Sequence, residues 1–140
     1  MDTMIWAKAH GATTHFPLAL VLCSGALDAA GFVLAGRPIV RDLHAGGYWT
    51  MLLGALGTVP AVFSGLLMTK GGLLGHGALR MHHLFVWPAF ALIIGLATWR
   101  LLVGRRATRP MFAGYLIGVG GAAALVLGAG YWGGELMIAR

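Results

Sequence analysis

Histidine is the residue type in this chain best suited to hold a metal ion or a haem. The chain has 140 residues and six histidines, and five of the six lie near the ends of apolar runs that we expect on one side of a membrane. Imidazole is a common ligand of haem iron and of metal ions. Ionisable side chains at a membrane boundary are candidates for function. The five histidines that we expect to gather at this face are His10, His15, His76, His82 and His83.

Two imidazoles that come from different helices at one depth can hold haem b between them. We expect His15 and either His82 or His83 to be the axial ligands, because they enter two different apolar runs at the same end. His82 and His83 lie about 100° apart on a helix, so only one of them points easily into a bundle. We expect His10 further out, near water, a propionate or a partner. Glu135 is expected to accept a hydrogen bond from the outer N–H of one imidazole.

Other interpretations of these side chains stay open. Each histidine taken singly also suits the membrane interface, where it would hydrogen-bond to water, lipid headgroups or a free carbonyl. Copper or zinc is a weaker alternative, because the chain has no HxH, CxxC or Met-rich ligand spacing. We expect no self-contained catalytic site, because no serine or cysteine has a base partner and Cys23 lies in the middle of an apolar run.

The composition predicts an integral membrane protein. Hydrophobic residues make up 59% of the chain and charged residues only 10%, whereas about a quarter of the residues are charged in soluble domains. A spanning helix needs about 20 apolar residues. Four runs are long enough, and we place the spans at about 13–36, 45–69, 81–103 and 111–135.

Short connections between these runs predict the arrangement of the spans. Sequential helices joined by short loops become antiparallel neighbours, so we expect a single all-α domain, an up-down bundle of four transmembrane helices in the lipid bilayer. A β-barrel would need alternating segments of about 10 residues, and no such alternation is present. The net charge of +6 is also compatible with nucleic-acid binding, but the arginines lie between apolar runs. We therefore expect no nucleic-acid partner.

The distribution of Lys and Arg predicts the orientation. The connections after the first and third runs are richer in these residues than the other end, and we place them in the cytoplasm. Both termini and the histidine face would then be periplasmic, in a bacterial inner membrane. Arg100, near the end of the third run, is expected to snorkel towards the interface. The residues at the cytoplasmic side are Arg37, Arg41, Arg100, Arg105, Arg106 and Arg109, and those at the other are Lys8, Lys70, Arg80 and Arg140.

Asp28 lies well inside the first expected span, where an ionised carboxylate is costly unless it is paired. We expect a polar clasp with His44, Tyr48 or Arg41 at the start of the second span, in preference to a step in a proton path. The chain also has 23 glycines, and small residues let membrane helices approach closely. Two rows of small residues spaced by four are expected to pack in this way: Gly57, Ala61 and Gly65, and Gly114, Gly118 and Ala122.

Both ends of the chain carry motifs of a known family. The run HGATTHFPLAL from His10 to Leu20 resembles the HPxxVHFPIAL opening of predicted four-helix bacterial membrane proteins catalogued as a domain of unknown function. The ending WGGEL from Trp132 to Leu136 resembles the closing GGEL of that family. Gly11 departs from the family motif, which has a proline there. The resemblance implies a four-helix membrane fold and a site near the histidines, and it assigns no activity.

These observations predict two functions from different classes. The first is a cytochrome b-like membrane subunit that binds haem b and transfers electrons within a respiratory or other redox complex, with membrane or periplasmic redox subunits as partners. The chain would be at most an electron-transfer subunit of an oxidoreductase. The second is a cofactor-free accessory subunit that packs against a larger membrane complex through its glycine-rich faces. A visible absorption spectrum distinguishes the two.

Overall fold

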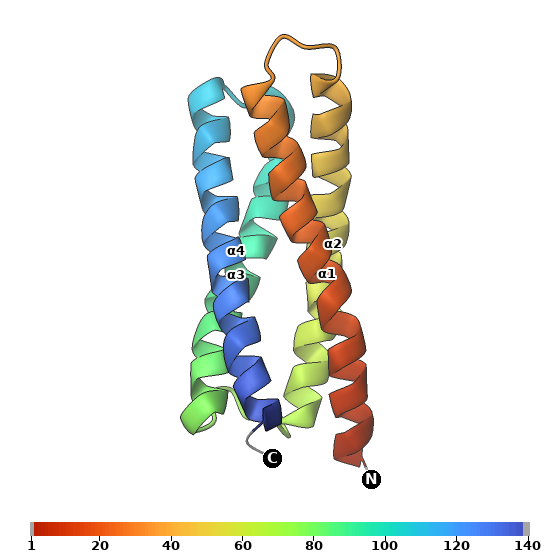
Figure 1. Cartoon of the computed structure of the whole chain (residues 1–140), viewed down its shortest axis with the longest axis vertical. Helices are drawn as coiled ribbons and strands as arrows, with labels where there is room; N and C mark the ends of the chain where they lie inside the picture. The colour runs from red at the N-terminus through yellow and green to blue at the C-terminus, as the bar shows by residue number, and fades with distance from the viewer. Residues whose placement is uncertain (1, 139–140) are drawn as a thin grey trace.

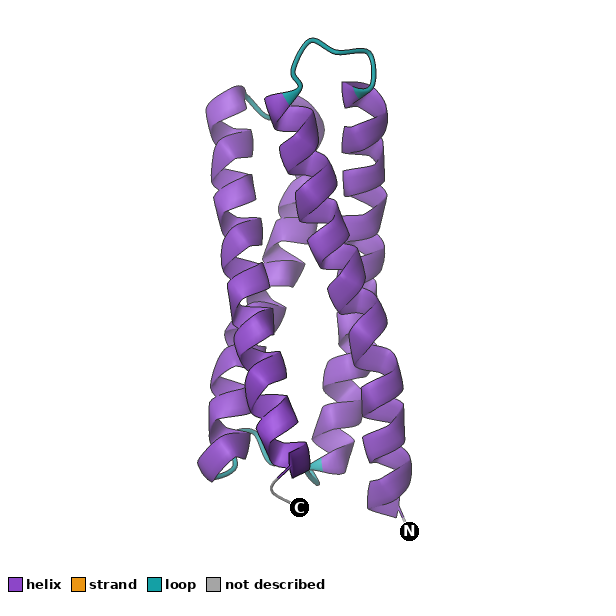
Figure 2. Ribbon diagram, viewed as in Figure 1, coloured by secondary structure: helices purple, strands orange, loops and turns teal. Residues whose placement is uncertain are grey.

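The computed structural model describes residues 2–138, which form a bundle of long helices (Figure 2). Within these residues there is no strand, and the predicted all-α fold is confirmed. A short 3-10 helix, η1, connects the last two long helices. The elements are α1 (Asp2–Val33), α2 (Val40–Met68), α3 (Gly77–Leu102), η1 (Gly104–Arg106) and α4 (Arg109–Ile138).

Each of the four α-helices is long and apolar enough to cross a membrane. The shortest, α3, has 26 residues, which at 1.5 Å per residue is about 39 Å and exceeds a hydrocarbon core of about 30 Å. A helix satisfies its backbone hydrogen bonds within itself, as lipid requires. The chain is a multi-pass membrane protein.

The bundle consists of two helical hairpins (Figure 1). Helix α1 packs most extensively on α2 and α3 on α4, whereas fewer contacts join α1 to α4 and α2 to α3. We call this sparser boundary between the two hairpins the seam. Helices α1 and α3 are therefore diagonal to each other, on opposite sides of the seam.

The two ends of the bundle differ in the residues they carry. Both termini and the α2–α3 loop lie at one end, which we call the terminal end (Figure 1). The α1–α2 and α3–α4 connections lie at the other end, which we call the arginine end because Arg37, Arg41, Arg105, Arg106 and Arg109 lie there. The apolar core lies between the ends and includes Val21, Met51, Ile93 and Val119, one from each helix.

Helix α1 begins at Asp2 and not near residue 13, where the first span was predicted to start. The added turns contain Lys8 and His10, whose polarity ends the apolar run in the sequence without ending the helix. Because of this extension, His10 lies well inside α1, and Pro17 is an interior residue of the helix.

Small residues of α2 let it approach α1 closely. A Cβ atom at Gly57 would lie 2.9 Å from the Pro17 Cβ, and one at Gly65 would lie 3.0 Å from the His10 Cε1. Distances this short leave no room for a larger residue. The predicted packing of this small-residue row is confirmed.

The corresponding row on α4 packs only in part. A Cβ at Gly118 would lie 2.9 Å from a Leu96 methyl group, and Ala122 is fully buried. Gly114, in contrast, is exposed and would have no neighbour within 4 Å. Gly114 therefore faces the outside of the bundle.

Candidate functional site

His10 and His82 face each other near the terminal end of the bundle. Their ring centroids are 6.5 Å apart, and their ring planes are nearly perpendicular, at 83°. His10 belongs to α1 and His82 to α3, which are diagonal helices from different hairpins. The two imidazoles therefore oppose each other across the seam.

Each imidazole of this pair is anchored within its own hairpin. The His10 Nδ1 lies 2.9 Å from the carbonyl oxygen of Ala61 on α2, and the His82 Nδ1 lies 2.7 Å from that of Ala129 on α4. A carbonyl oxygen only accepts, so Nδ1–H is the donor in both rings, and Nε2 keeps the lone pair when the ring is neutral. Histidines that ligate metals usually donate their other N–H to such an oxygen.

Ser64 is a further neighbour of the His10 ring. Its hydroxyl oxygen lies 3.2 Å from the His10 Nδ1 and 3.2 Å from the Thr13 hydroxyl oxygen, and it donates to the Ala61 carbonyl at 2.9 Å. These contacts tie the His10 side of the pair to α2. The orientation of the ring is therefore fixed by more than one hydrogen bond.

His83 is a third imidazole beside the pair. It is 7% exposed, and its ring centroid lies 5.9 Å from that of His82 and 6.2 Å from the Trp87 ring. Its Nδ1 is buried without a hydrogen-bond partner among residues 2–138. An unsatisfied buried polar atom costs about 1–3 kcal/mol. His83 is therefore a buried polar residue that packing alone does not explain.

His15 and Glu135 do not lie where they were expected. His15 is exposed, because five residues turn a helix by about 140° and His10 already faces α2. The residue of α1 that opposes His82 is thus His10, which corrects the expected orientation of His15. Glu135 is also exposed, and the acceptor for the His82 N–H is the Ala129 carbonyl.

The histidine pair by itself does not make up an all-protein metal site. Within the described residues, no three His, Cys, Asp or Glu side chains are arranged to hold a metal ion, whereas structural zinc takes four ligands. The two rings come from different hairpins, so they would hold a group that lies between the hairpins. The two described cavities lie elsewhere, so a porphyrin would need the seam to widen.

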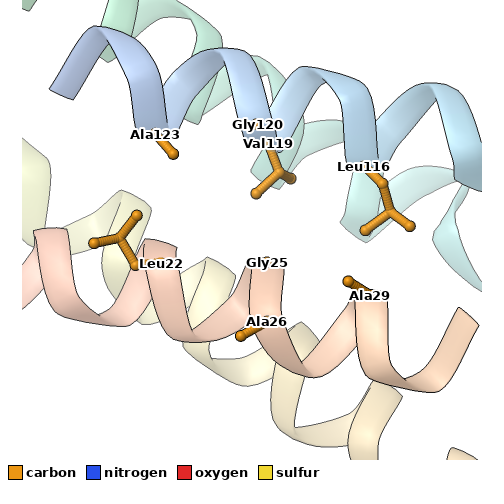
Figure 3. Close-up of a pocket in the computed structure, with 8 residues that line it drawn as sticks. All are labelled: Leu22, Gly25, Ala26, Ala29, Leu116, Val119, Gly120 and Ala123. Carbon is orange, nitrogen blue, oxygen red and sulfur yellow. The ribbon is translucent and has the colours of Figure 1, made fainter. Parts of the chain in front are cut away.

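The first of these cavities is an apolar gap between α1 and α4 in the middle of the bundle, with a volume of about 320 Å³. Leucine, valine, alanine and glycine residues of the two helices line it (Figure 3). It offers no polar group to a substrate. The cavity lies in the seam, where α1 meets α4, and indicates that the two hairpins are not tightly packed there.

A buried polar cluster lies towards the arginine end and draws on all four helices. Asp28 of α1 is fully buried. Its Oδ1 accepts hydrogen bonds from the Arg100 Nη2 at 2.7 Å and the His44 Nδ1 at 2.9 Å, and its Oδ2 accepts one from the Tyr115 hydroxyl at 3.2 Å. The predicted clasp with His44 is confirmed, whereas the sequence analysis did not identify Arg100 and Tyr115 as partners.

Arg100 does not snorkel, and that expectation was wrong. It is only 5% exposed, and its Nη2 also donates to the His44 carbonyl oxygen at 3.0 Å. Its guanidinium carbon lies 4.9 Å from the centroid of the Phe112 ring. Inside the bundle, the Asp28 carboxylate and the Phe112 ring take the place of the water that would solvate the Arg100 guanidinium at the interface.

Comparison with protein-family models, curated proteins and solved structures finds no match for this chain. The features that bear on its function are therefore the histidine pair with its carbonyl anchors, the buried cluster around Asp28 and the charge at the arginine end.

Proposed function

We propose that the protein is a small electron-transfer subunit of a membrane redox complex, and that His10 and His82 hold haem b between the two hairpins. The observation that carries this proposal is the matched anchoring of the two rings. Each Nδ1–H donates to a carbonyl oxygen of the other helix of its own hairpin, and each Nε2 is free of hydrogen bonds from residues 2–138. Both free nitrogens belong to rings that face each other across the seam.

Glycines behind the two rings support the proposal. Gly65 of α2 lies against the His10 ring, and Gly133 of α4 lies against the His82 ring, where added Cβ atoms would come within 3.0 and 3.4 Å. The imidazoles can sit close to the backbones of their own hairpins because these positions have no side chain. The sparse contacts along the seam support a separation of the hairpins when a flat group enters.

The chemistry that such a site supports is electron transfer. Haem b held by His10 and His82 would supply one-electron redox chemistry. The residues described here would bind and orient the group, and the Asp28 cluster would hold the four helices together at the other end. A partner subunit would supply and remove the electron.

The distribution of charge supports an orientation for this role. The arginine end holds most of the cationic residues, and cytoplasmic connections are enriched in Lys and Arg. We therefore place both termini and the histidine pair on the periplasmic side of a bacterial inner membrane. Electrons would pass between a periplasmic partner and another membrane component.

The experiment that tests the proposal is an absorption spectrum of the protein purified after expression with ample haem. We expect a Soret band, and α and β bands on reduction with dithionite. His10→Ala and His82→Ala should each lose these low-spin bands. His15→Ala and His76→Ala are matched controls, because both side chains are exposed, and these variants should keep the bands.

The conservative variant His10→Met covers the case in which the alanine variant does not fold. A thioether can replace one imidazole as an axial ligand, so this variant should keep haem with a changed spectrum. If haem-supplied wild-type protein shows no Soret band, the electron-transfer proposal fails. A cofactor-free accessory subunit then becomes the better description of the chain.

A further inference from the structure

The arginine end of the bundle contains a cavity of about 630 Å³. Residues from the end of α1, the start of α2, the end of α3, η1 and the start of α4 line it. Its volume lies in the range of about 300–1,000 Å³ that is typical of ligand sites. The cavity is at the opposite end of the molecule from the histidine pair. Binding of a ligand in this cavity would not depend on haem.

Four arginines line the cavity, and among them only Arg100 forms an ion pair with an acidic residue, the buried Asp28. Arg41, Arg100, Arg105 and Arg109 line it together with His44, and neither Asp nor Glu does. Asp42 follows Arg41 in the chain but is exposed and does not line the cavity. The ion pairs found among residues 2–138 involve only the Asp28 carboxylate, which is fully buried. The cavity therefore carries an excess of positive charge.

Arg100 gives the cavity a fixed guanidinium with a spare donor. Its Nη2 is held by the Asp28 carboxylate and the His44 carbonyl oxygen. Its Nε is buried and has no hydrogen-bond partner in the part of the chain that the structure describes. Arginine is the preferred partner of phosphate, because its planar fork matches the phosphate oxygens. Arg100 as a whole lines the cavity, and its guanidinium is held in place there by the Asp28 carboxylate and the His44 carbonyl oxygen.

The remaining lining is apolar and reaches the outside of the bundle. Phe32, Trp49 and Phe112 contribute aromatic rings to the cavity, and Trp49 is 60% exposed. The guanidinium carbon of Arg109 lies 4.6 Å from the centroid of the Phe32 ring, which holds this arginine beside the cavity. A ligand that fits such a lining has an anionic end and an apolar end.

We propose that this cavity binds the phosphate headgroup of an anionic phospholipid, with the glycerol and the upper acyl chain against the aromatic residues. Basic pockets between transmembrane helices recognise phospholipid headgroups in this way. Arg41 and Arg105, both exposed, would reach the phosphate from the first turn of α2 and from η1. The bound lipid would join the α1–α2 hairpin to the α3–α4 hairpin at this end of the seam.

The test is native mass spectrometry of the detergent-purified chain titrated with phosphatidylglycerol or with phosphatidylcholine. We expect phosphatidylglycerol to bind at least tenfold more tightly than the zwitterionic lipid. The double variant Arg41→Gln/Arg105→Gln should weaken phosphatidylglycerol binding by about 30-fold, since each arginine contributes about fivefold to lipid attraction. The matched control is Arg37→Gln/Arg106→Gln, which removes the same charge from exposed residues that do not line the cavity. This control should bind almost as the wild type does.

Three results would overturn the proposal. Equal weakening in the two double variants would show that diffuse surface charge attracts the lipid, without a specific site. Equal binding of the two lipids would show that the site does not recognise the net negative charge of the lipid. Inorganic phosphate that competes at the same concentration as phosphatidylglycerol would identify a site for a free anion, in which the aromatic residues have no role.

Discussion

The carboxylate of Asp28 lies inside the bundle with no exposure, and three side chains from the other three helices donate hydrogen bonds to it. Removing one partner of a buried ion pair costs more than replacing both, because the remaining charge is left without compensation. The cluster therefore couples the stability of α1 to that of α3, although these helices are diagonal to each other.

We expect Asp28→Leu to destabilise the protein by about 3–5 kcal/mol, because it leaves the Arg100 guanidinium buried without its carboxylate. Asp28→Asn should cost less, because the amide oxygen still accepts a hydrogen bond. The measurement is the free energy of unfolding in mild detergent. Asp42→Asn is the control, since Asp42 is exposed and outside the cluster.

The double variant Asp28→Leu/Arg100→Leu separates charge compensation from packing. If the ion pair explains the loss, this variant should recover much of the stability that Asp28→Leu loses, because neither charge is then buried alone. Equal stability of the Asn and Leu variants at position 28, or no recovery in the double variant, would contradict this description of the cluster.

At the residue scale, the sequence indicated some of these partners and not others. His44 was expected near Asp28, because it opens the span that follows. Arg100 was not expected near Asp28, because an arginine close to a helix end commonly snorkels to the interface. The signal that could have found it is depth, because Asp28 and Arg100 both lie near the arginine ends of their helices. The partners expected for Asp28 came only from the start of the second span. The direction of a side chain depends on how its helix is rotated about its axis. The spacing of residues along a uniformly apolar run does not specify this rotation.

The same limit applies to the histidines. The sequence placed His10, His15, His82 and His83 at one end of the bundle, and the structure brings His10, His82 and His83 together there. It chose His15 and not His10 as the inward-facing residue of α1, because the apolar run of the first span begins directly after His15. The choice depends on the start of the helix and on the contact of His10 with Ala61 of α2.

At the scale of the elements, the α1–α2 contact depends on glycine. A Cβ at Gly54 would lie 2.8 Å from a Val21 methyl carbon and 3.2 Å from the Pro17 carbonyl oxygen. The backbone oxygen cannot move aside without bending α1. Gly114 offers a matched comparison, because it is a helical glycine that faces open space.

We expect Gly54→Ala to destabilise the bundle by about 1–3 kcal/mol through overpacking. Gly114→Ala should be neutral or stabilising by up to about 1 kcal/mol, because alanine favours the helix and meets no neighbour. Thermal unfolding of both variants in the same detergent provides the comparison. If the two variants unfold at the same temperature, the helices do not depend on close approach at Gly54.

At the scale of the whole molecule, the four helices and their order were predictable, because apolar runs of this length have few structures open to them in lipid. The division into two hairpins was not predictable from the sequence. The order of the helices along the chain does not show how tightly α1 packs against α4. The seam matters for the two proposals, because the histidine pair lies across it and the cavity at the arginine end spans it.

The orientation of the molecule is testable by labelling. After replacement of Cys23 by alanine, a cysteine introduced at Arg106 should resist a membrane-impermeant maleimide in intact cells, because we place the arginine end in the cytoplasm. A cysteine at His76, in the loop at the terminal end, should react readily. The reverse pattern would place the histidine pair in the cytoplasm.

The most direct measurement on the whole molecule is low-temperature electron paramagnetic resonance of the oxidised protein, prepared with ample haem. In the proposed function, His10 and His82 would both hold the haem iron, and we expect its low-spin ferric signal to require both imidazoles. We predict this signal in the wild type and in His15→Ala, and its loss in His10→Ala. The absence of a low-spin haem signal in the wild type, or a signal that survives His10→Ala and disappears in His15→Ala, would contradict the assignment of His10 and His82 as the ligands.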